Sequence, residues 1–180
     1  MSTRALYTFK GESAKDSWNV YKHHDGYPVG AAQVLQNTLD HYAWQLPRYE
    51  PDEFAAAFCA AGKSQQYLRA IEAVEAHDGE AYKNAIRYSA LGEYKSQGGG
   101  VRFMPQGAPL KVASKHCSDI EFRYEIYEKQ TGKLYVRAYA VNAWDNPTET
   151  LLTDCPVSEF AAWAEAAEKA DAAQDAADAS

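Results

Sequence analysis

The chain has 180 residues, of which 46% are hydrophobic and 13% aromatic, and its formal net charge is −7. This length and composition fit one packed domain with a substantial core. No apolar run approaches the ~18 residues of a membrane helix, and no charged-then-apolar leader is present, so a soluble cytoplasmic protein is expected. No basic patch is visible, which disfavours direct binding to nucleic acid.

The three cysteines, Cys59, Cys117 and Cys155, form no CxxC pair. Neither a disulfide framework nor a zinc knuckle is therefore predicted. No other pattern specifies a metal or a cofactor, and none is expected.

The first quarter of the chain predicts two strands and a helix. Residues 5–9 and 18–22 carry large and β-branched side chains in the pattern of half-buried strands. Asp25-Gly26 is a turn dipeptide in which glycine accepts a positive φ without steric cost. Pro28 suits the first turn of a helix, so the predicted order is strand, tight turn, helix.

Helices are predicted through the middle of the chain. Pro51 begins one of them, with acidic residues in its first turn, and Gly62 is expected to cap its C-terminus. Another helix is expected from Ser64 to about residue 76. Residues 65–95 are expected to be helical or else to contain irregular structure, and the helical middle of the chain either covers the sheet or forms an inserted lobe.

The strongest strand pattern lies in the second half of the chain. A short strand is expected at residues 101–104. Residues 120–126 alternate between apolar and polar, and a turn at Gly132 leads into residues 134–141, which predicts a hairpin. Arg137 is expected opposite Glu121 or Glu125, where opposite charges stabilise a ladder.

The end of the chain predicts an edge strand at residues 151–153 and then a helix from about Ser158. Beyond Ala166 the sequence is rich in Ala and Asp and has little apolar surface to bury, so it is expected to fray or to project as a solvated arm. Five acidic residues and one lysine lie from Glu165 onward, which is more than half of the net charge.

Together these elements predict an α+β fold. An antiparallel sheet, built from the N-terminal strands and the later hairpin, is expected to be covered by helices on one face. Residues 1–165 form a single domain in this interpretation. Residues 166–180 form an acidic tail.

Residues 21–28, Tyr-Lys-His-His-Asp-Gly-Tyr-Pro, crowd two imidazoles and a carboxylate beside the predicted turn. Three interpretations stay open: hydrogen bonds within the turn, with Tyr27 packed beneath it; a partner-binding edge; or a catalytic site in which His23 or His24 is a general base oriented by Asp25. Adjacent side chains on a strand point to opposite faces, so only one imidazole is expected in a given pocket. The same alternation disfavours a shared metal ion.

The run from Val20 to Pro28, followed by Gly30, resembles the Tyr-x-His-x-Asp-Gly-Tyr-Pro signature of small uncharacterised proteins from bacteriophages, prophages and other microbial genomes. The similarity covers roughly the first quarter of the chain. A looser echo occurs at residues 100–104 and in the tyrosine-rich hairpin. The resemblance implies a phage or mobile-element setting and transfers no catalytic residue.

The leading hypothesis is a phage-encoded accessory protein that binds a host protein, for example as an anti-CRISPR-like inhibitor of bacterial defence. Tyrosine suits such a role because it offers a large contact area with one polar group. The acidic charge favours a partner with a basic surface, including one that normally holds nucleic acid. The expected binding residues are Tyr21, Tyr27, Arg102 and Tyr124.

The alternative hypothesis is a small hydrolase or transferase with His23, His24 and Asp25 as its catalytic residues. A virion or assembly component is a third interpretation, and the oligomeric state is left open. The hairpin also resembles a stacking platform for bases, but few basic residues are interleaved there, which favours core and interface roles. The tyrosines in question are Tyr124, Tyr127, Tyr135 and Tyr139.

Overall fold

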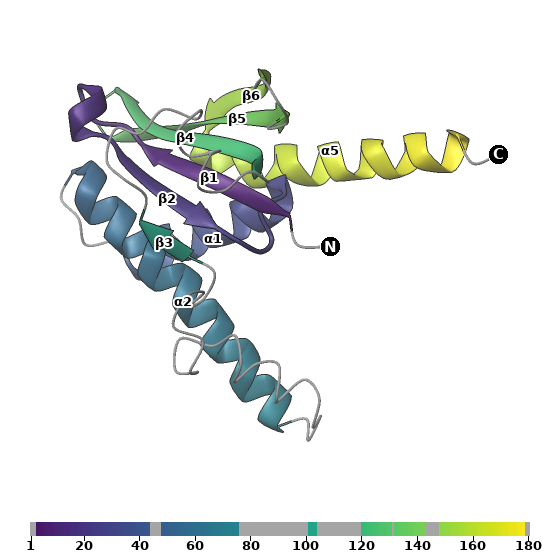
Figure 1. Cartoon of the computed structure of the whole chain (residues 1–180), viewed down its shortest axis with the longest axis horizontal. Coiled ribbons are helices and arrows are strands. Elements are labelled where there is room, and N and C mark those ends of the chain that lie inside the picture. Colours follow the sequence, from purple (N-terminus) through teal and green to yellow (C-terminus); the bar gives the residue numbers. More distant parts are fainter. Residues whose placement is uncertain are drawn as a thin grey trace.

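The structure is a computed structural model, and it describes residues 3–43, 48–75, 101–103, 120–130, 132–142 and 148–178. These residues form a six-stranded sheet, a 3-10 turn and three α-helices (Figure 1). The elements are β1 (Arg4–Phe9), η1 (Ala14–Asp16), β2 (Trp18–Lys22), α1 (Pro28–His41), α2 (Pro51–Glu75), β3 (Val101–Phe103), β4 (Ile120–Gln130), β5 (Lys133–Asn142), β6 (Thr148–Pro156) and α5 (Val157–Asp178). The predicted α+β class is confirmed.

The strand order is β3-β2-β1-β4-β5-β6. All neighbouring strands pair antiparallel except β1 and β4, which are parallel. The expectation of a purely antiparallel sheet is therefore wrong, and the sheet is mixed. The physical reason is the long connection between β1 and β4, because parallel neighbours need a crossover that a short hairpin loop cannot provide.

The main core lies between the sheet and the helices. Tyr7 of β1 and Val136 of β5 face Leu35 of α1, Phe58 of α2 and Phe160 of α5, and each of these side chains is at most 1% exposed. Burying a large apolar side chain contributes roughly 1.5–3 kcal/mol. All three described helices therefore pack on the same face of the sheet.

The other face of the sheet has a different character. Near β1 and β2 it carries a small buried cluster of Leu6, Tyr21 and Ile120, with Val141 packed against it. Across β4, β5 and β6 it carries charged and tyrosine side chains instead. The period-two alternation of each strand places apolar and polar residues on these opposite faces.

Helix α2 is longer than the sequence pattern predicts. It runs without a break from Pro51 to Glu75, so the expected C-cap at Gly62 and the new start at Ser64 are wrong. Glycine inside a helix costs only about 1 kcal/mol relative to alanine, and the alanines before Gly62 and the good helix formers after it outweigh that cost. The remainder of the proposed insertion at residues 65–95 lies outside the described residues.

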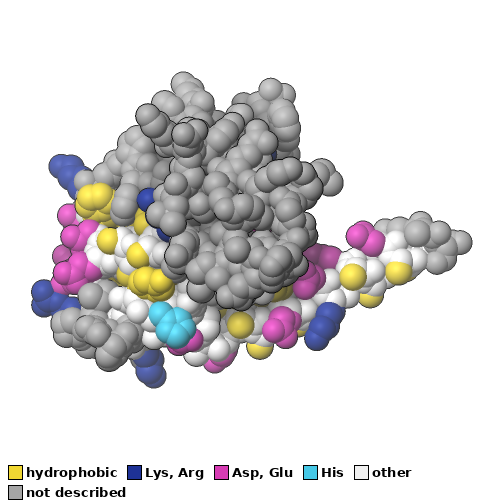
Figure 2. Space-filling view, turned by 90° about the horizontal axis from the view of Figure 1, so that it is seen from below, with side chains coloured by type: hydrophobic (Ala, Val, Ile, Leu, Met, Phe, Trp, Pro, Cys, Tyr) yellow, Lys and Arg dark blue, Asp and Glu magenta, His cyan; other side chains and the backbone are white. Residues whose placement is uncertain are grey.

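Helix α5 begins immediately after β6 and extends well past the sheet (Figure 1). Phe160 and Ala164 are buried in the core, whereas nearly all residues from Glu165 to Ala177 are exposed. Figure 2 shows this arm carrying acidic side chains among small apolar ones. The predicted tail therefore projects as a continuous helix. Among the described helices, none is both long and apolar enough to cross a membrane.

Candidate functional site

The predicted strand, turn and helix around residues 21–28 are confirmed. Strand β2 ends at Lys22 and α1 begins at Pro28. Asp25, not glycine, takes the left-handed conformation, with φ of 52°, which aspartate tolerates better than most residues. Glycine is required at position 26 because there is no room for a side chain: a Cβ there would lie 2.8 Å from the Ala5 nitrogen. Its own nitrogen donates a hydrogen bond to the Thr3 carbonyl at 2.9 Å.

The two imidazoles lie together at this turn. Their ring centroids are 4.5 Å apart in an edge-to-face arrangement, so the expected divergence of His23 and His24 is wrong. The reason is that β2 ends at Lys22, and strand alternation does not apply beyond it. Arg4 Nε donates to His23 Nδ1 at 3.3 Å. Because arginine can only donate, a neutral His23 carries its proton on Nε2.

Lys22 and Tyr21 also form hydrogen bonds at the turn. The Lys22 ammonium, on a residue only 6% exposed, donates to the carbonyl oxygens of His24 and Asp25. The Tyr21 hydroxyl lies 2.9 Å from His23 Nδ1. The pKa of His24 is lowered, mainly by burial. The nearby Asp25 carboxylate acts to raise this pKa, whereas the positive charges of Lys22 and Arg4 lower it further. The turn is therefore held by Lys22 from within and by Arg4 and Thr3 from the N-terminal segment.

Two stacked tyrosines lie beneath the turn. The Tyr124 hydroxyl donates to the Gly26 carbonyl at 2.8 Å, and its ring centroid is 5.0 Å from that of Tyr7. The Tyr7 hydroxyl is fully buried, and no described residue bonds to it. Burial, and then the nearby Asp25 carboxylate, raise the pKa of Tyr7.

The structure divides the expected binding residues. Tyr21 is 5% exposed, Tyr124 is buried in the core, and Tyr27 is 37% exposed on the surface. The backbone of Arg102 pairs with Tyr21 between β3 and β2. The position of the Arg102 side chain lies outside the described part of the structure. Tyr21 therefore gathers with the histidines, whereas Tyr27 points to solvent.

A second polar region covers the helix-free side of β4, β5 and β6, and we call it the Arg–Tyr face. Its two arginines each join two carboxylates. Arg123 Nη1 lies 2.7 Å from Glu125 Oε1 and Arg123 Nη2 lies 2.8 Å from Glu149 Oε2. Arg137 Nε lies 2.9 Å from Asp154 Oδ2, and its Nη1 lies 3.7 Å from Glu125 Oε2. The Arg–Tyr face consists of Arg123, Glu125, Tyr127, Tyr135, Arg137, Tyr139, Glu149 and Asp154.

Tyrosine rings alternate with these ion pairs. The Arg123 guanidinium lies 4.2 Å from the centroid of the Tyr139 ring, and that of Arg137 lies 4.5 Å from the Tyr127 ring. The Tyr127 hydroxyl donates to Asp154 Oδ1 at 2.6 Å. Contacts between cations and ring faces add about 0.5–1 kcal/mol at exposed sites. The rings and guanidinium groups are therefore held in fixed positions.

The electrostatics of the face centre on Glu125. Burial would raise the pKa of this carboxyl, but the bond from Arg123 and the charges of Arg123, Lys10 and Arg137 hold it below its usual value. Burial likewise acts to lower the pKa of Arg123, and its bonds to Glu149 and Glu125 more than reverse that effect. Glu125 and Arg123 are therefore both charged at neutral pH.

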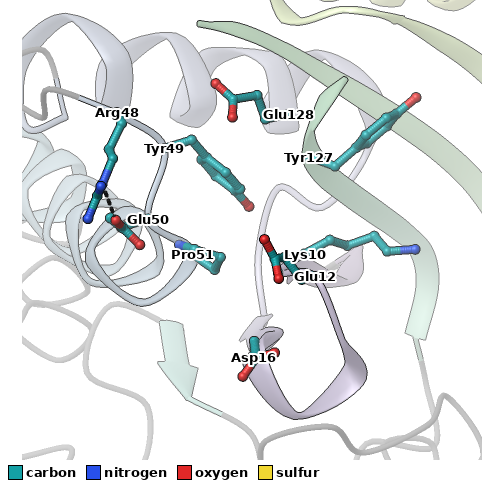
Figure 3. Close-up of a pocket in the computed structure, with 10 residues that line it drawn as sticks. Lys10, Glu12, Asp16, Arg48, Tyr49, Glu50, Pro51, Tyr127 and Glu128 are labelled. Carbon is teal, nitrogen blue, oxygen red and sulfur yellow. Dashed lines mark ion pairs between the residues drawn. The ribbon is translucent and has the colours of Figure 1, made fainter. Parts of the chain in front are cut away.

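A cavity of about 880 Å³ lies beside this face, at the end of the sheet (Figure 3). Its walls come from the end of β1, from η1, from the start of α2 and from the end of β4. Tyr127 lines the cavity and also belongs to the Arg–Tyr face. Lys10, another lining residue, reaches Glu125 on that face at 3.5 Å. The two regions are therefore continuous.

Sequence reasoning found part of the Arg–Tyr face. The predicted pairing of Arg137 with Glu125 is confirmed by the strand register. Along their strands, the three tyrosines of the face lie an even number of residues from Arg123 or Arg137. Side chains two residues apart on a strand point to the same face, so this spacing predicts that these residues share one face of the sheet. The cavity had no local signal, because its walls come from four separate segments.

Comparisons with protein-family models, with curated proteins and with solved structures found no match to this chain. At the turn, polar groups bond to each other and to the backbone. No group of three or more His, Cys, Asp or Glu among the described residues is close enough to hold a metal ion. The Arg–Tyr face, by contrast, presents rigid side chains over a broad surface.

Proposed function

We propose that this protein binds a partner protein through the Arg–Tyr face, and that the partner presents a basic surface. The observation that carries the proposal is the ladder of ion pairs and stacked rings across β4, β5 and β6. Tyrosine and arginine are enriched at protein interfaces and dominate their binding energy. Three half-buried tyrosines and two arginines on adjoining strands match that composition.

The rigidity of these side chains supports the proposal. Ordering a flexible side chain at an interface costs about 0.5–1.5 kcal/mol. Arg123 and Arg137 are already held by carboxylates on one side and by tyrosine rings on the other. Little further order is needed on binding, so more of the contact energy is available as affinity.

The distribution of charge supports a basic partner. The two arginines of the face are matched by three carboxylates, Glu125, Glu149 and Asp154, so the face itself carries no excess of positive charge. Acidic residues are in excess in the neighbouring cavity and along α5. An excess of negative charge on the protein favours encounter with a positive partner surface.

The resemblance to phage and prophage proteins suggests where such a partner occurs. A host protein with a basic nucleic-acid-binding surface, such as a component of a bacterial defence system, has the required chemistry. In this proposal the protein acts as an accessory protein that occupies the basic surface. The catalytic alternative at His23, His24 and Asp25 stays a prediction. Of these three side chains, His23 already accepts a hydrogen bond from Arg4 at its Nδ1.

The proposal is tested by capture of partners from a bacterial lysate, followed by titration with the purified partner. We expect saturable binding that weakens as salt is added, because the partner surface is charged. The double variant Tyr135→Ala/Tyr139→Ala removes two rings from the face and is expected to weaken binding by about tenfold or more.

Gln33→Ala is the matched control, because Gln33 is exposed on α1, on the opposite side of the sheet. This variant is expected to bind as the unchanged protein does. Circular dichroism checks that each variant is folded. Equal affinities of the double variant and the control, or no saturable partner at all, would count against the proposal.

A further inference from the structure

The cavity beside the Arg–Tyr face has the chemistry of a site for a cationic side chain. Four acidic residues line it, Glu12, Asp16, Glu50 and Glu128, against two basic residues, Lys10 and Arg48. Figure 3 shows the Glu12 and Glu50 carboxylates and the ring of Tyr49 around the same space. An anionic ligand would be repelled here.

Both basic residues of the cavity already have partners. Arg48 forms an ion pair with Glu50, and the Lys10 ammonium lies 3.5 Å from Glu125 on the neighbouring face. Asp16 accepts a hydrogen bond from the Ser13 hydroxyl at 2.6 Å. Glu12, in contrast, has neither a hydrogen bond nor an ion pair with any described residue. Its carboxylate is therefore available to a ligand.

The walls around Glu12 are rigid. The Tyr49 hydroxyl donates to the Ile126 carbonyl at 2.9 Å, and burial raises its pKa, so it stays neutral. On the other side, Gly11 packs so tightly that a Cβ there would lie 2.5 Å from the Asp16 carbonyl oxygen. The Gly11 nitrogen also donates to Ser17 Oγ at 3.2 Å. These contacts between Gly11 and residues 16–17 hold the loop that carries Glu12 in a compact conformation.

The spacing of the carboxylates distinguishes an extended cation from a single ion. Among the described residues, no three acidic, His or Cys side chains are close enough to surround one metal ion. A planar guanidinium can instead lie against a tyrosine ring and donate in its own plane to a carboxylate. The cavity volume of about 880 Å³ falls within the usual range for ligand sites, so it has room for a side chain with its neighbouring residues.

We infer that the cavity binds an arginine side chain of the partner, with the guanidinium against Tyr49 and bonded to Glu12. The identity of the ligand as part of a protein rests on the proposed function. Tyr127 and Lys10 connect the cavity to the Arg–Tyr face, so one partner can contact both regions.

The test is an NMR titration of the isotope-labelled full chain with Nα-acetyl-L-arginine amide at low salt. We expect saturable shifts of the Gly11 and Glu50 backbone amides. The lysine analogue is expected to bind more weakly, and the uncharged citrulline analogue, which has nearly the same shape, is expected not to bind. Equal binding of citrulline and arginine, or shifts confined to other parts of the chain, would overturn the inference.

Glu12→Gln provides the sharper comparison, because it removes one charge from a carboxylate that makes no described contact. We expect the affinity for the arginine analogue to fall about fivefold. Glu53→Gln is the control: Glu53 is an exposed acid in the first turn of α2 and does not line the cavity. An equal loss in both variants would show a general effect of net charge and would overturn the site.

The two proposals can fail separately. If the partner binds through Tyr135 and Tyr139 but no arginine analogue enters the cavity, the inference fails and the proposed function stands. If the analogue binds to the cavity while the double tyrosine variant retains the partner, the proposed interface fails. The inference that the cavity binds an arginine side chain would then still stand.

Discussion

The turn at residues 21–28 and the Arg–Tyr face are both rich in polar side chains, yet they use them differently. At the turn, Lys22 and Tyr124 bond to backbone carbonyls and His23 accepts from a neighbouring side chain. On the face, arginines and carboxylates bond to one another across three strands and leave tyrosine rings at the surface. A dense sequence motif can thus mark a stretch of backbone with strict conformational and packing requirements. A contact surface, by contrast, is formed by residues that are dispersed along the sequence.

The largest expected effect concerns the backbone at the turn. In Gly26→Ala, the new Cβ would meet the backbone of β1 at 2.8 Å. We expect a loss of about 3 kcal/mol in the free energy of unfolding, measured by urea denaturation, because neither segment of backbone can easily move.

Gly132→Ala is the matched control on the hairpin. Gly132 has a φ of 77°, but an added Cβ meets no atom within 4 Å. Only the strain of the left-handed conformation remains, and we expect a loss of about 1 kcal/mol. If the two variants lose the same stability, close packing at Gly26 is not the reason for glycine in the motif.

The next effect compares the two stacked tyrosines beneath the turn. Tyr124→Phe removes the donor to the Gly26 carbonyl, and we expect a loss of about 1–2 kcal/mol. Tyr7→Phe removes a buried hydroxyl that no described residue satisfies. It is expected to be neutral or to stabilise by up to about 1 kcal/mol. Thermal unfolding of both variants is the measurement, and an equal loss in both would contradict this assignment.

Local patterns predicted much of this fold. The Asp25-Gly26 turn and Pro28 located the start of α1, and alternating residues located the β4–β5 hairpin with Arg137 opposite Glu125. These features depend on neighbouring residues, so the sequence alone specifies them. The roles within the turn were less predictable. Asp25 takes the positive φ, and Gly26 is needed for contact with β1, which is distant in sequence.

Features that depend on long-range packing were missed. The parallel pairing of β1 with β4 follows from a crossover between segments more than 100 residues apart, which no local pattern encodes. Helix α2 continues through Gly62 because its neighbours favour helix more than one glycine opposes it. The cavity joins Glu12, Tyr49 and Glu128 from three distant segments. Charge and periodicity within any one segment do not reveal it.

A smaller effect is expected at the centre of the Arg–Tyr face. Glu125→Gln weakens the bonds to Arg123 and Arg137, and we expect a loss of about 1 kcal/mol at neutral pH, because solvent screens part of this network. Glu121→Gln is the control, since Glu121 is exposed on the same strand. An equal loss of stability in the two variants would show that the ion pairs of Glu125 do not stabilise the Arg–Tyr face.

The same carboxylate predicts a pH dependence. Its folded pKa lies below the ordinary value of 4.5, so its stabilising contribution is complete above that value and is lost as the pH falls through the folded pKa. The unchanged protein is therefore expected to lose more stability on acidification than Glu125→Gln. Urea denaturation at several acidic pH values measures the difference, and parallel curves would contradict it.

The smallest effect concerns His24 at the turn. Its pKa is lowered below 6.5 by burial, so the unfolded chain binds a proton more readily than the folded one. Stability is then complete above about pH 6.5 and falls as the pH decreases toward the folded pKa. His24→Gln should flatten this part of the stability curve. A steeper curve for His24→Gln would refute the assignment.

The most direct test of the proposed interface is photo-crosslinking in the host cell. A photoreactive amino acid is placed at Tyr135 on the Arg–Tyr face, and in a second protein at Gln33 on the helical side. The account predicts a discrete crosslinked adduct with one partner from position 135 and none from position 33. An adduct from position 33 alone would contradict it.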